Sequence, residues 1–194
     1  RKRMPRTLEI ADAVITDSEF VRREVIETFA LNPARVHVVH LGVDDSFRPH
    51  SESETRDAMA AFGLRHGCYL LALATLEPRK NLERLLDAYE RLDAGLRRQY
   101  PLVLAGATGW HANRLVERID ALAERGQARR LGYVAEDTLP QLVAGARALA
   151  FPSVYEGFGL PPLEAMASGV PVMASSASCI PEVTADAALL VPPD

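Results

Sequence analysis

Short apolar runs alternate with amphipathic segments along the whole chain, and this alternation limits the fold more than any other feature of the sequence. The apolar runs have the length of strands, and we expect strands at Ala13–Thr16, Val36–His40, Tyr69–Ala74, Leu102–Ala105, Ala128–Leu131, Ala148–Phe151, Val172–Ala174 and Ala188–Val191. Strands that are apolar throughout are typical of a parallel sheet covered on both faces. The predicted fold is therefore α/β, a Rossmann-like doubly wound parallel sheet.

Two segments between the strands have clear helical periodicity. The first places four apolar residues on one face: Leu82, Leu85, Leu86 and Tyr89. The second has its apolar face at Leu115, Ile119 and Leu122. It should end at Gly126, because glycine is favoured just past the C-terminus of a helix.

One stretch interrupts this rhythm. Leu41–Pro49 and the polar run Ser51–Arg56 have neither period, and we interpret them as an interdomain linker. Residues 1–45 would then be the tail of an N-terminal, acceptor-binding domain with its linker, and residues 46–194 a second domain truncated at its C-terminus. Both ends of the chain look arbitrary, so we interpret the sequence as a fragment.

The bulk numbers exclude several classes of protein. The chain has 194 residues, 48% hydrophobic and 25% charged, with a formal net charge of −4, the balance of a soluble globular protein. This charge gives no reason to expect nucleic acid as a partner. The one basic cluster, Arg1-Lys2-Arg3 with Arg6, favours a solvated face or membrane contact in the parent protein. No run approaches the ~20 apolar residues of a membrane span, and no signal-peptide core is present.

The sequence predicts neither a metal site nor a cofactor. Cys68 and Cys179 are far apart and fit no metal spacing, so we expect reduced, structural thiols in a cytoplasmic protein. The five histidines, His37, His40, His50, His66 and His111, form no ligand pair at helical spacing. No Asp-x-Asp triplet occurs that could hold a divalent ion beside a diphosphate.

Ligands of open α/β sheets bind in the loops at the carboxyl ends of the strands, and three such loops stand out in this chain. In Thr75–Asn81, Arg79 and Lys80 stand at a helix entrance, with Asn81 as a candidate N-cap. The alternative for this pair is two solvated cations. In Ala105–Gly109, Gly106 allows backbone to approach a ligand or simply closes a turn.

The loop and helix from Pro152 to Val172 carry the strongest signal. A glycine-rich bend leads into a proline pair that suits a first helical turn, so the N–H groups of Gly157, Phe158, Gly159 and Leu160 should lie where an anion is favoured.

Glu156 and Glu164 flank this anion site. Carboxylates accept hydrogen bonds from hydroxyl groups, and one carboxylate can bind a vicinal diol. A ligand with a central diphosphate and a polyol at each end fits the pattern, which describes a nucleotide diphospho-sugar. The alternatives are an exposed loop acid at Glu156 and helix-dipole compensation in a first turn at Glu164.

These residues resemble glycosyltransferase family 4, a group of retaining enzymes with the GT-B fold. Glu156 and Glu164, with seven residues between them, are similar to the family's Glu-x7-Glu motif, and the surrounding Pro-Ser-x-Tyr-Glu-Gly-Phe-Gly-Leu-Pro pattern agrees with it. Thr75–Asn81 is similar to the family's phosphate loop, although many members have Gly-Arg where this chain has Ala74-Thr75. The resemblance implies the C-terminal, donor-binding half of a GT-B fold.

The resemblance also implies a role for each site residue. Glu156 would contact the transferred sugar, Glu164 would hold the ribose, and Arg79 and Lys80 would bind the diphosphate with Thr75 and Gly106 nearby. The backbone of Gly157–Leu160 would contact the sugar and diphosphate, and Tyr133 and Val134 would lie along the base. We count Glu156, Lys80 and Arg79 as the candidate catalytic residues. The two cations would supply positive charge at the departing diphosphate, which lowers the barrier, and Glu156 would contact the sugar that is transferred.

The predicted reaction is metal-independent transfer of a sugar, with retention, to a glycan or lipid-linked acceptor in cell-surface polysaccharide or glycolipid assembly. Similarity to bacterial mannosyltransferases favours GDP-mannose as donor. The parent enzyme would be cytoplasmic, with peripheral membrane association through its N-terminal domain, and the isolated fragment inactive. The alternatives are an epimerase or hydrolase of nucleotide sugars on the same fold, or a non-catalytic nucleotide-sugar-binding module.

Overall fold

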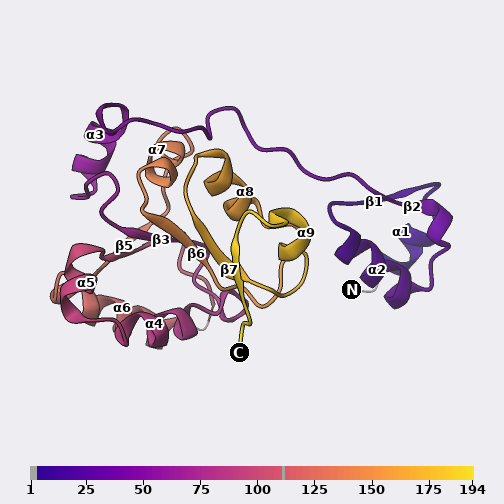
Figure 1. Cartoon of the computed structure of the whole chain (residues 1–194). Helices are drawn as coiled ribbons and strands as arrows, with labels where there is room; N and C mark the ends of the chain where they lie inside the picture. Colours follow the sequence, from indigo (N-terminus) through magenta and orange to yellow (C-terminus); the bar gives the residue numbers. More distant parts are fainter. Residues whose placement is uncertain (1–3, 111) are drawn as a thin grey trace.

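The computed structural model describes residues 4–110 and 112–194, so Arg1, Lys2, Arg3 and His111 lie outside the described residues. Its main sheet has six parallel strands in the order β5-β4-β3-β6-β7-β8 (Figure 1). The strands are β3 (Leu70–Leu73), β4 (Leu102–Ala105), β5 (Ala128–Gly132), β6 (Ala148–Phe151), β7 (Val172–Ser175) and β8 (Leu189–Val191). All six lie at the predicted places, and the doubly wound α/β fold is confirmed.

Helices cover both faces of this sheet (Figure 1). The helices are α3 (Glu52–Ala61), α4 (Leu82–Glu90), α5 (Ala94–Gln99), α6 (Asn113–Glu124), α7 (Leu139–Ala144), α8 (Leu160–Ala167) and α9 (Ile180–Thr184). Successive strand residues enter opposite cores: in β3, Leu71 packs with α7 and α8, while Ala72 packs with α4 and α6. Successive side chains of a strand point to opposite faces of the sheet, and here both faces are buried. The strands are therefore apolar throughout.

The two predicted helix faces are confirmed. Leu86 of α4 and Ile119 of α6 are each 0% exposed, and the other five predicted face residues are also buried. Burying such a side chain contributes about 1.5–3 kcal/mol. Gly126 follows α6 with a φ of 67°, and the N–H of Gln127 donates to the carbonyl of Leu122, which ends the helix.

The N-terminal residues form a separate unit, which we call the β1–β2 unit (residues 4–40). It contains α1 (Met4–Ile10), β1 (Val14–Thr16), α2 (Glu19–Phe29), a 3-10 turn (Pro33–Arg35) and β2 (Val36–Val38). Its two strands pair with each other in parallel and join no strand of the main sheet. That residues 1–45 belong to a preceding domain stays a prediction.

The linker prediction was wrong for Ser51–Arg56. Ser51 caps α3 in a capping box: its hydroxyl accepts the Glu54 N–H, and the Glu54 carboxylate accepts the Ser51 N–H. Thr55 and Met59 are buried on one side of the helix. The polar run is therefore the exposed part of an amphipathic helix.

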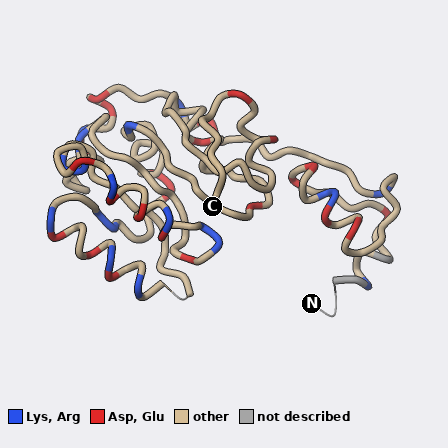
Figure 2. The backbone as a smooth tube through the Cα atoms, turned by 60° about the horizontal axis from the view of Figure 1, so that its bottom comes forward, with Lys and Arg blue, Asp and Glu red and all other residues tan. Residues whose placement is uncertain are grey.

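Charged residues are mixed along the outer helices. Figure 2 shows basic residues, which are all Arg on α4 and α6, interspersed with Asp and Glu along these helices. Arg118 of α6 pairs with Asp87 and Glu90 of α4 at 2.8 and 2.7 Å, so the two helices are bridged at the surface. Pairs this exposed contribute little to stability.

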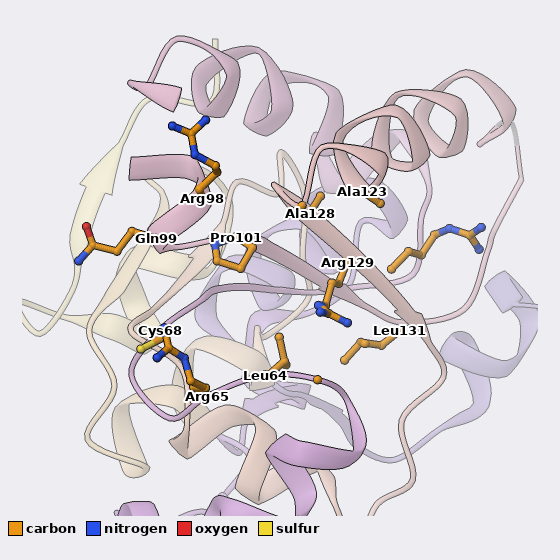
Figure 3. Close-up of a pocket in the computed structure, with 13 residues that line it drawn as sticks. Leu64, Arg65, Cys68, Arg98, Gln99, Pro101, Ala123, Ala128, Arg129 and Leu131 are labelled. Carbon is orange, nitrogen blue, oxygen red and sulfur yellow. The ribbon is translucent and has the colours of Figure 1, made fainter. Parts of the chain in front are cut away.

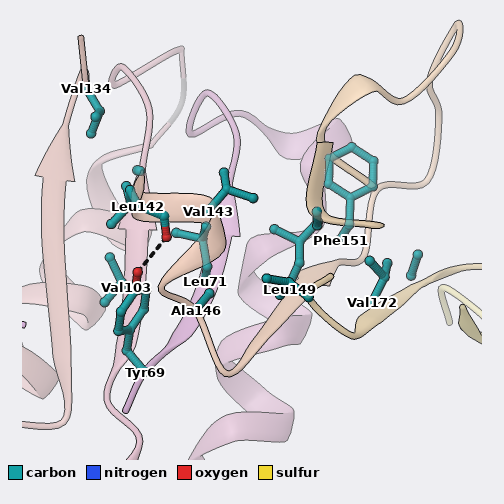
Figure 4. Close-up of a cluster of buried hydrophobic side chains, with 14 of the residues drawn as sticks. Tyr69, Leu71, Val103, Val134, Leu142, Val143, Ala146, Leu149, Phe151 and Val172 are labelled. Atoms are coloured by element: carbon teal, nitrogen blue, oxygen red, sulfur yellow. Dashed lines mark hydrogen bonds between the residues drawn. The ribbon is translucent and has the colours of Figure 1, made fainter. Parts of the chain in front are cut away.

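Tyr69 supplies the polar contact in the core beneath α7. Its side chain is 0% exposed, and its hydroxyl donates to the carbonyl of Leu142, 2.5 Å away, in the last turn of the helix (Figure 4). That carbonyl needs a partner because the last carbonyls of a helix have none within the helix.

Tyr69→Phe should therefore lower the free energy of unfolding by about 1–3 kcal/mol, since the Leu142 carbonyl is left buried without a donor. Tyr133→Phe is the matched control, because Tyr133 is 74% exposed. Urea unfolding measures both variants, and equal stabilities of Tyr69→Phe and wild type would contradict this role of the hydroxyl.

Candidate functional site

The order of strands reverses between β3 and β6, at the centre of the sheet. From β3 the chain moves outward through β4 to β5, and from β6 it moves the other way through β7 to β8. Ligands of open α/β sheets bind beside such a reversal, at the carboxyl ends of the strands. The loops that leave β3 and β6 there carry Arg79, Lys80 and Glu156.

The structure joins these three predicted residues in one ion cluster. Lys80 Nζ lies 2.5 Å from Glu156 Oε1, and Arg79 Nη1 lies 2.8 Å from Glu156 Oε2. Arg79 Nε also lies 2.6 Å from Glu77 Oε1. Lys80 and Glu156 are 9% and 8% exposed, so neither charge could be removed without leaving the other buried and underpaired.

Backbone contacts hold the same two loops together. The N–H of Val154 donates to the Arg79 carbonyl at 2.9 Å, and Arg79 Nη1 donates to the Tyr155 carbonyl at 3.1 Å. Arg79 and Lys80 lie in a 3-10 turn (Pro78–Lys80), after which Asn81 takes a left-handed φ of 55°.

Asn81 occupies the N-cap position of α4, but its side chain makes no capping hydrogen bond there. Its amide donates instead to the Pro193 carbonyl at 2.8 Å. The predicted side-chain cap was wrong, because capping residues normally have an extended backbone that aims the side chain at the first helical N–H groups.

The glycine-rich bend (residues 153–159) ends at the N-terminus of α8. Pro161 and Pro162 lie in the first turn of this helix, as predicted. Gly159 has a φ of 98°, which strains any residue with a side chain, and a Cβ on it would lie 2.7 Å from Ile180 Cδ1, so the Ile180 side chain would have to shift. Within the described part of the chain, the N–H groups of Gly157, Phe158 and Gly159 meet no hydrogen-bond acceptor. They are unpaired donors at the positive end of a helix dipole.

Glu164 lies apart from the ion cluster. It is the fifth residue of α8, so the alternative that it compensates the helix dipole from the first turn was wrong. The side chain is half-buried, and burial raises its pKa above the ordinary value. Among the described residues, no side chain donates to it.

Gly106 supports the loop after β3. A Cβ on Gly106 would lie 2.1 Å from the Ala74 carbonyl oxygen, and its N–H donates to the Gly132 carbonyl at 2.7 Å. The glycine therefore lets two βα loops pack backbone to backbone, beside the exposed Thr75. Contact of Gly106 and Thr75 with a substrate stays a prediction.

The predicted base-binding segment follows β5, at the edge of the sheet. Tyr133 is 74% exposed, whereas the Val134 side chain packs into the hydrophobic core. Only the backbone of Val134 is left to face a ligand.

A cavity of about 530 Å³ lies beside the amino ends of β4 and β5, at the opposite ends of the strands from the predicted site (Figure 3). Its charged lining consists of Arg65, Arg98, Arg129 and Arg130. Arg129 donates to the Phe62 carbonyl at the end of α3, at 3.1 Å, and Arg130 pairs with Asp120. The cavity includes none of the predicted site residues.

The β1–β2 unit packs against the glycine-rich bend through the N-terminus of α2, a contact that sequence reasoning missed. The Ser18 hydroxyl caps α2 and donates to the Gly157 carbonyl at 2.5 Å. The Glu182 carboxylate of α9 accepts the N–H groups of Glu19 and Phe20 at 2.8 and 3.2 Å. It therefore accepts hydrogen bonds from two first-turn N–H groups of α2, which have no partner within the helix and lie 163 and 162 residues away in sequence.

Further contacts extend this interface. His40 Nε2 lies 2.7 Å from Glu182 Oε1, and the Tyr155 hydroxyl bonds the Glu24 carboxylate. The bond to Glu24, together with burial, raises the pKa of Tyr155 to about 12. The Phe20 and Tyr155 rings meet edge to face, with centroids 5.8 Å apart.

Cys179 contacts two backbone carbonyls of the bend. Its thiol lies 3.2 Å from the Glu156 carbonyl and 3.0 Å from the Phe158 carbonyl, and the neighbouring Ser178 hydroxyl accepts the Glu156 N–H. Burial raises the pKa of the Cys179 thiol to about 11, which keeps it a protonated donor. Both Cys68 and Cys179 are free thiols, as predicted.

The family described as "Glycosyl transferases group 1" matches residues 65–194, which include the whole ion cluster, the bend and α8. The chain belongs to this family. A second match, to "Glycosyltransferase Family 4", covers residues 1–47, and the resemblance inferred from the sequence is confirmed.

Several curated proteins that are similar to this chain are mannosyltransferases. The O-antigen chain mannosyltransferase B of Escherichia coli is 39% identical over 193 residues, which are 100% of this chain and 51% of that protein. The serotype-specific mannosyltransferase WbdA, also of Escherichia coli, is 36% identical over 90% of this chain and 22% of its own length. The chain thus spans about half the length of the first of these relatives and about a fifth of the length of the second.

Solved glycosyltransferases share the fold. The Anabaena protein HepE, solved with UDP and glucose, has a TM-score of 0.81 at 24% identity, over 94% of this chain and 50% of that chain. Sucrose-phosphate synthase from Thermosynechococcus elongatus has a TM-score of 0.73 at 26% identity, over 98% and 48%. The chain is the C-terminal, Rossmann-like half of a GT-B fold, as predicted.

In residues 4–110 and 112–194, no three His, Cys, Asp or Glu side chains gather into a group that could hold a metal ion. Over the same residues, no helix combines the length and the apolar character that a membrane span requires. Metal independence stays a prediction.

The contact between α2 and Glu182 should weaken in acid. Burial opposes the ionisation of Glu182, but the N–H of Glu19, the His40 ring and the N–H of Phe20 hold its pKa below the ordinary value of 4.5. Because the folded pKa is the lower one, this stabilisation is complete above the unfolded pKa and is lost as the pH falls through the folded pKa.

Amide NMR shifts of Glu19 and Phe20, titrated from about pH 6 to about pH 3, should report that transition in the wild type. Glu182→Gln should abolish the step, and Glu136→Gln, at an exposed loop position, should leave it unchanged. The same titration curve in wild type and Glu182→Gln would contradict the assignment.

Proposed function

We propose that this chain is the donor-binding half of a retaining, metal-independent glycosyltransferase that uses a nucleotide diphospho-sugar. One observation carries the proposal: the unpaired N–H groups of Gly157–Gly159 lie in the loop that is ion-paired to the buried Lys80 and the exposed Arg79, at the switch point of the sheet. A diphosphate is the ligand class that both features favour.

The same geometry suggests how the charge of the leaving group is stabilised. Negative charge grows on the diphosphate as the bond to the sugar breaks, so fixed positive groups there lower the barrier. Arg79 and Lys80 are held ready by Glu156, and the α8 N-terminus adds its dipole and N–H donors. These groups need no metal ion.

The other site residues would bind the parts of the donor on either side of the diphosphate. Glu156 lies in the bend and would turn to the hydroxyls of the transferred sugar, with the backbone of Gly157–Leu160 beside it. Glu164, which has no partner among the described side chains, would accept hydrogen bonds from the ribose. The exposed Tyr133 and the backbone of Val134 would lie along the base.

For the whole enzyme we propose mannosyl transfer from GDP-mannose in cell-surface polysaccharide assembly, on the cytoplasmic side of the membrane. The support is the name of the relative that is 39% identical, an O-antigen chain mannosyltransferase. The HepE structure, at 24% identity, contains UDP and glucose and supports only the donor class.

Thermal shift of the full-length protein against a panel of nucleotide sugars tests the donor class.

Lys80→Met should weaken binding of inorganic pyrophosphate about tenfold or more, since a charge-assisted hydrogen bond contributes about 1.5–3 kcal/mol. It should weaken binding of the nucleoside diphosphate whose sugar conjugate gives a thermal shift by the same factor, and binding of the free nucleoside far less. Arg84→Met, at an exposed position of α4, is the control. Equal losses for nucleoside and diphosphate would rule out the phosphate assignment.

Substitutions of Glu156 and Glu164 should affect different kinetic constants. Glu164→Gln removes a contact with the unchanging ribose, so KM for the donor should rise with a smaller effect on kcat. Glu156→Gln acts where charge and geometry change, so kcat should fall most. Assays of full-length variants at saturating and at low donor measure both effects. The reverse pattern would mean that the donor lies the other way round.

A further inference from the structure

Asp17 faces the glycine-rich bend from the β1–β2 unit. It directly follows β1, and a Cβ built on Gly157 would lie 3.3 Å from its Oδ2 and 3.8 Å from its Oδ1. The carboxylate is therefore aimed at the bend, beside Glu156. This is the loop position after a parallel strand, where α/β proteins place binding residues.

The neighbouring contacts fix Asp17 in this place. Ser18, the next residue, is bonded to the Gly157 carbonyl, and Glu182 holds the two residues after it through their N–H groups. The backbone of Asp17 therefore cannot move away from the bend without breaking the α2 interface.

The Asp17 carboxylate is half-buried, and among the described residues it makes no hydrogen bond or ion pair. The two cations of the site, Arg79 and Lys80, are already paired with Glu156. A partly desolvated carboxylate without a donor is unfavourable, and an incoming group that donates a hydrogen bond would offset that cost.

The chemistry of the carboxylate narrows the class of ligand. A carboxylate repels phosphate and accepts hydrogen bonds from hydroxyl groups. In the proposed function, the donor is held by loops of the main sheet, whereas Asp17 approaches the bend from the β1–β2 unit. We propose that Asp17 binds a hydroxyl group of the acceptor sugar and positions that sugar against the bound donor; this inference rests on the proposed function.

The test uses the full-length protein with GDP bound, and methyl α-D-mannopyranoside as the acceptor probe, because the relatives are named mannosyltransferases. Ligand-observed NMR gives the affinity for the mannoside, and calorimetry gives the affinity for GDP. Asp17→Asn should weaken mannoside binding about tenfold, the loss of one hydrogen bond to a charged group, and leave GDP binding unchanged. Glu27→Gln, at an exposed position of α2, should change neither.

Thermal unfolding without ligand provides a readout independent of any acceptor. Asp17→Asn should melt at the wild-type temperature or above it, because no hydrogen bond of the protein is lost. A lower melting temperature would make Asp17 a structural residue and overturn the proposal, as would equal mannoside affinities in wild type and Asp17→Asn. If GDP and the other nucleotides of the panel failed to bind even the wild type, the proposed function itself would fail.

Discussion

The Glu156 carboxylate, buried between Lys80 and Arg79, is the contact on which the rest of the site depends. It joins the loop after β3 to the loop after β6, and these two strands are neighbours only because the strand order reverses between them. A carboxylate this far from water needs both cations, so each loop stabilises the other. The same pairing holds two cations against the loop that carries the unpaired N–H groups of the bend, without a bound anion.

Two other parts of the chain hold the bend in shape. Cys179 and Ser178 hold Glu156 and Phe158 from the loop after β7, while Ser18 holds Gly157 from the β1–β2 unit. Glu182 then ties the start of α2 to α9. The bend is thus positioned by the interface as well as by its own glycines, which couples the docking of the β1–β2 unit to the geometry of the proposed donor site.

The sequence alone determined the doubly wound fold, because each strand that is buried on both faces must be apolar throughout, and each covering helix must show one apolar face. It also gave the family and the loops that matter, since the glycine and proline pattern around Glu156 has few other uses. It misjudged Ser51–Arg56, where the polar run hides a capping box, and the side chain of Asn81, whose left-handed backbone turns it toward Pro193.

Only the tertiary structure decided which of these groups meet. Arg79 and Lys80 lie 77 and 76 residues before Glu156, and Glu19 lies 163 residues before Glu182. No local pattern specifies such pairs, because hydrogen bonds and ion pairs form between whichever groups the strand order and the interface bring within about 3 Å. The partner of Glu182 and the unpaired state of Asp17 are properties of that arrangement. The sequence determined which polar groups are present. The tertiary structure decided which of them are hydrogen-bonded and which remain without a partner.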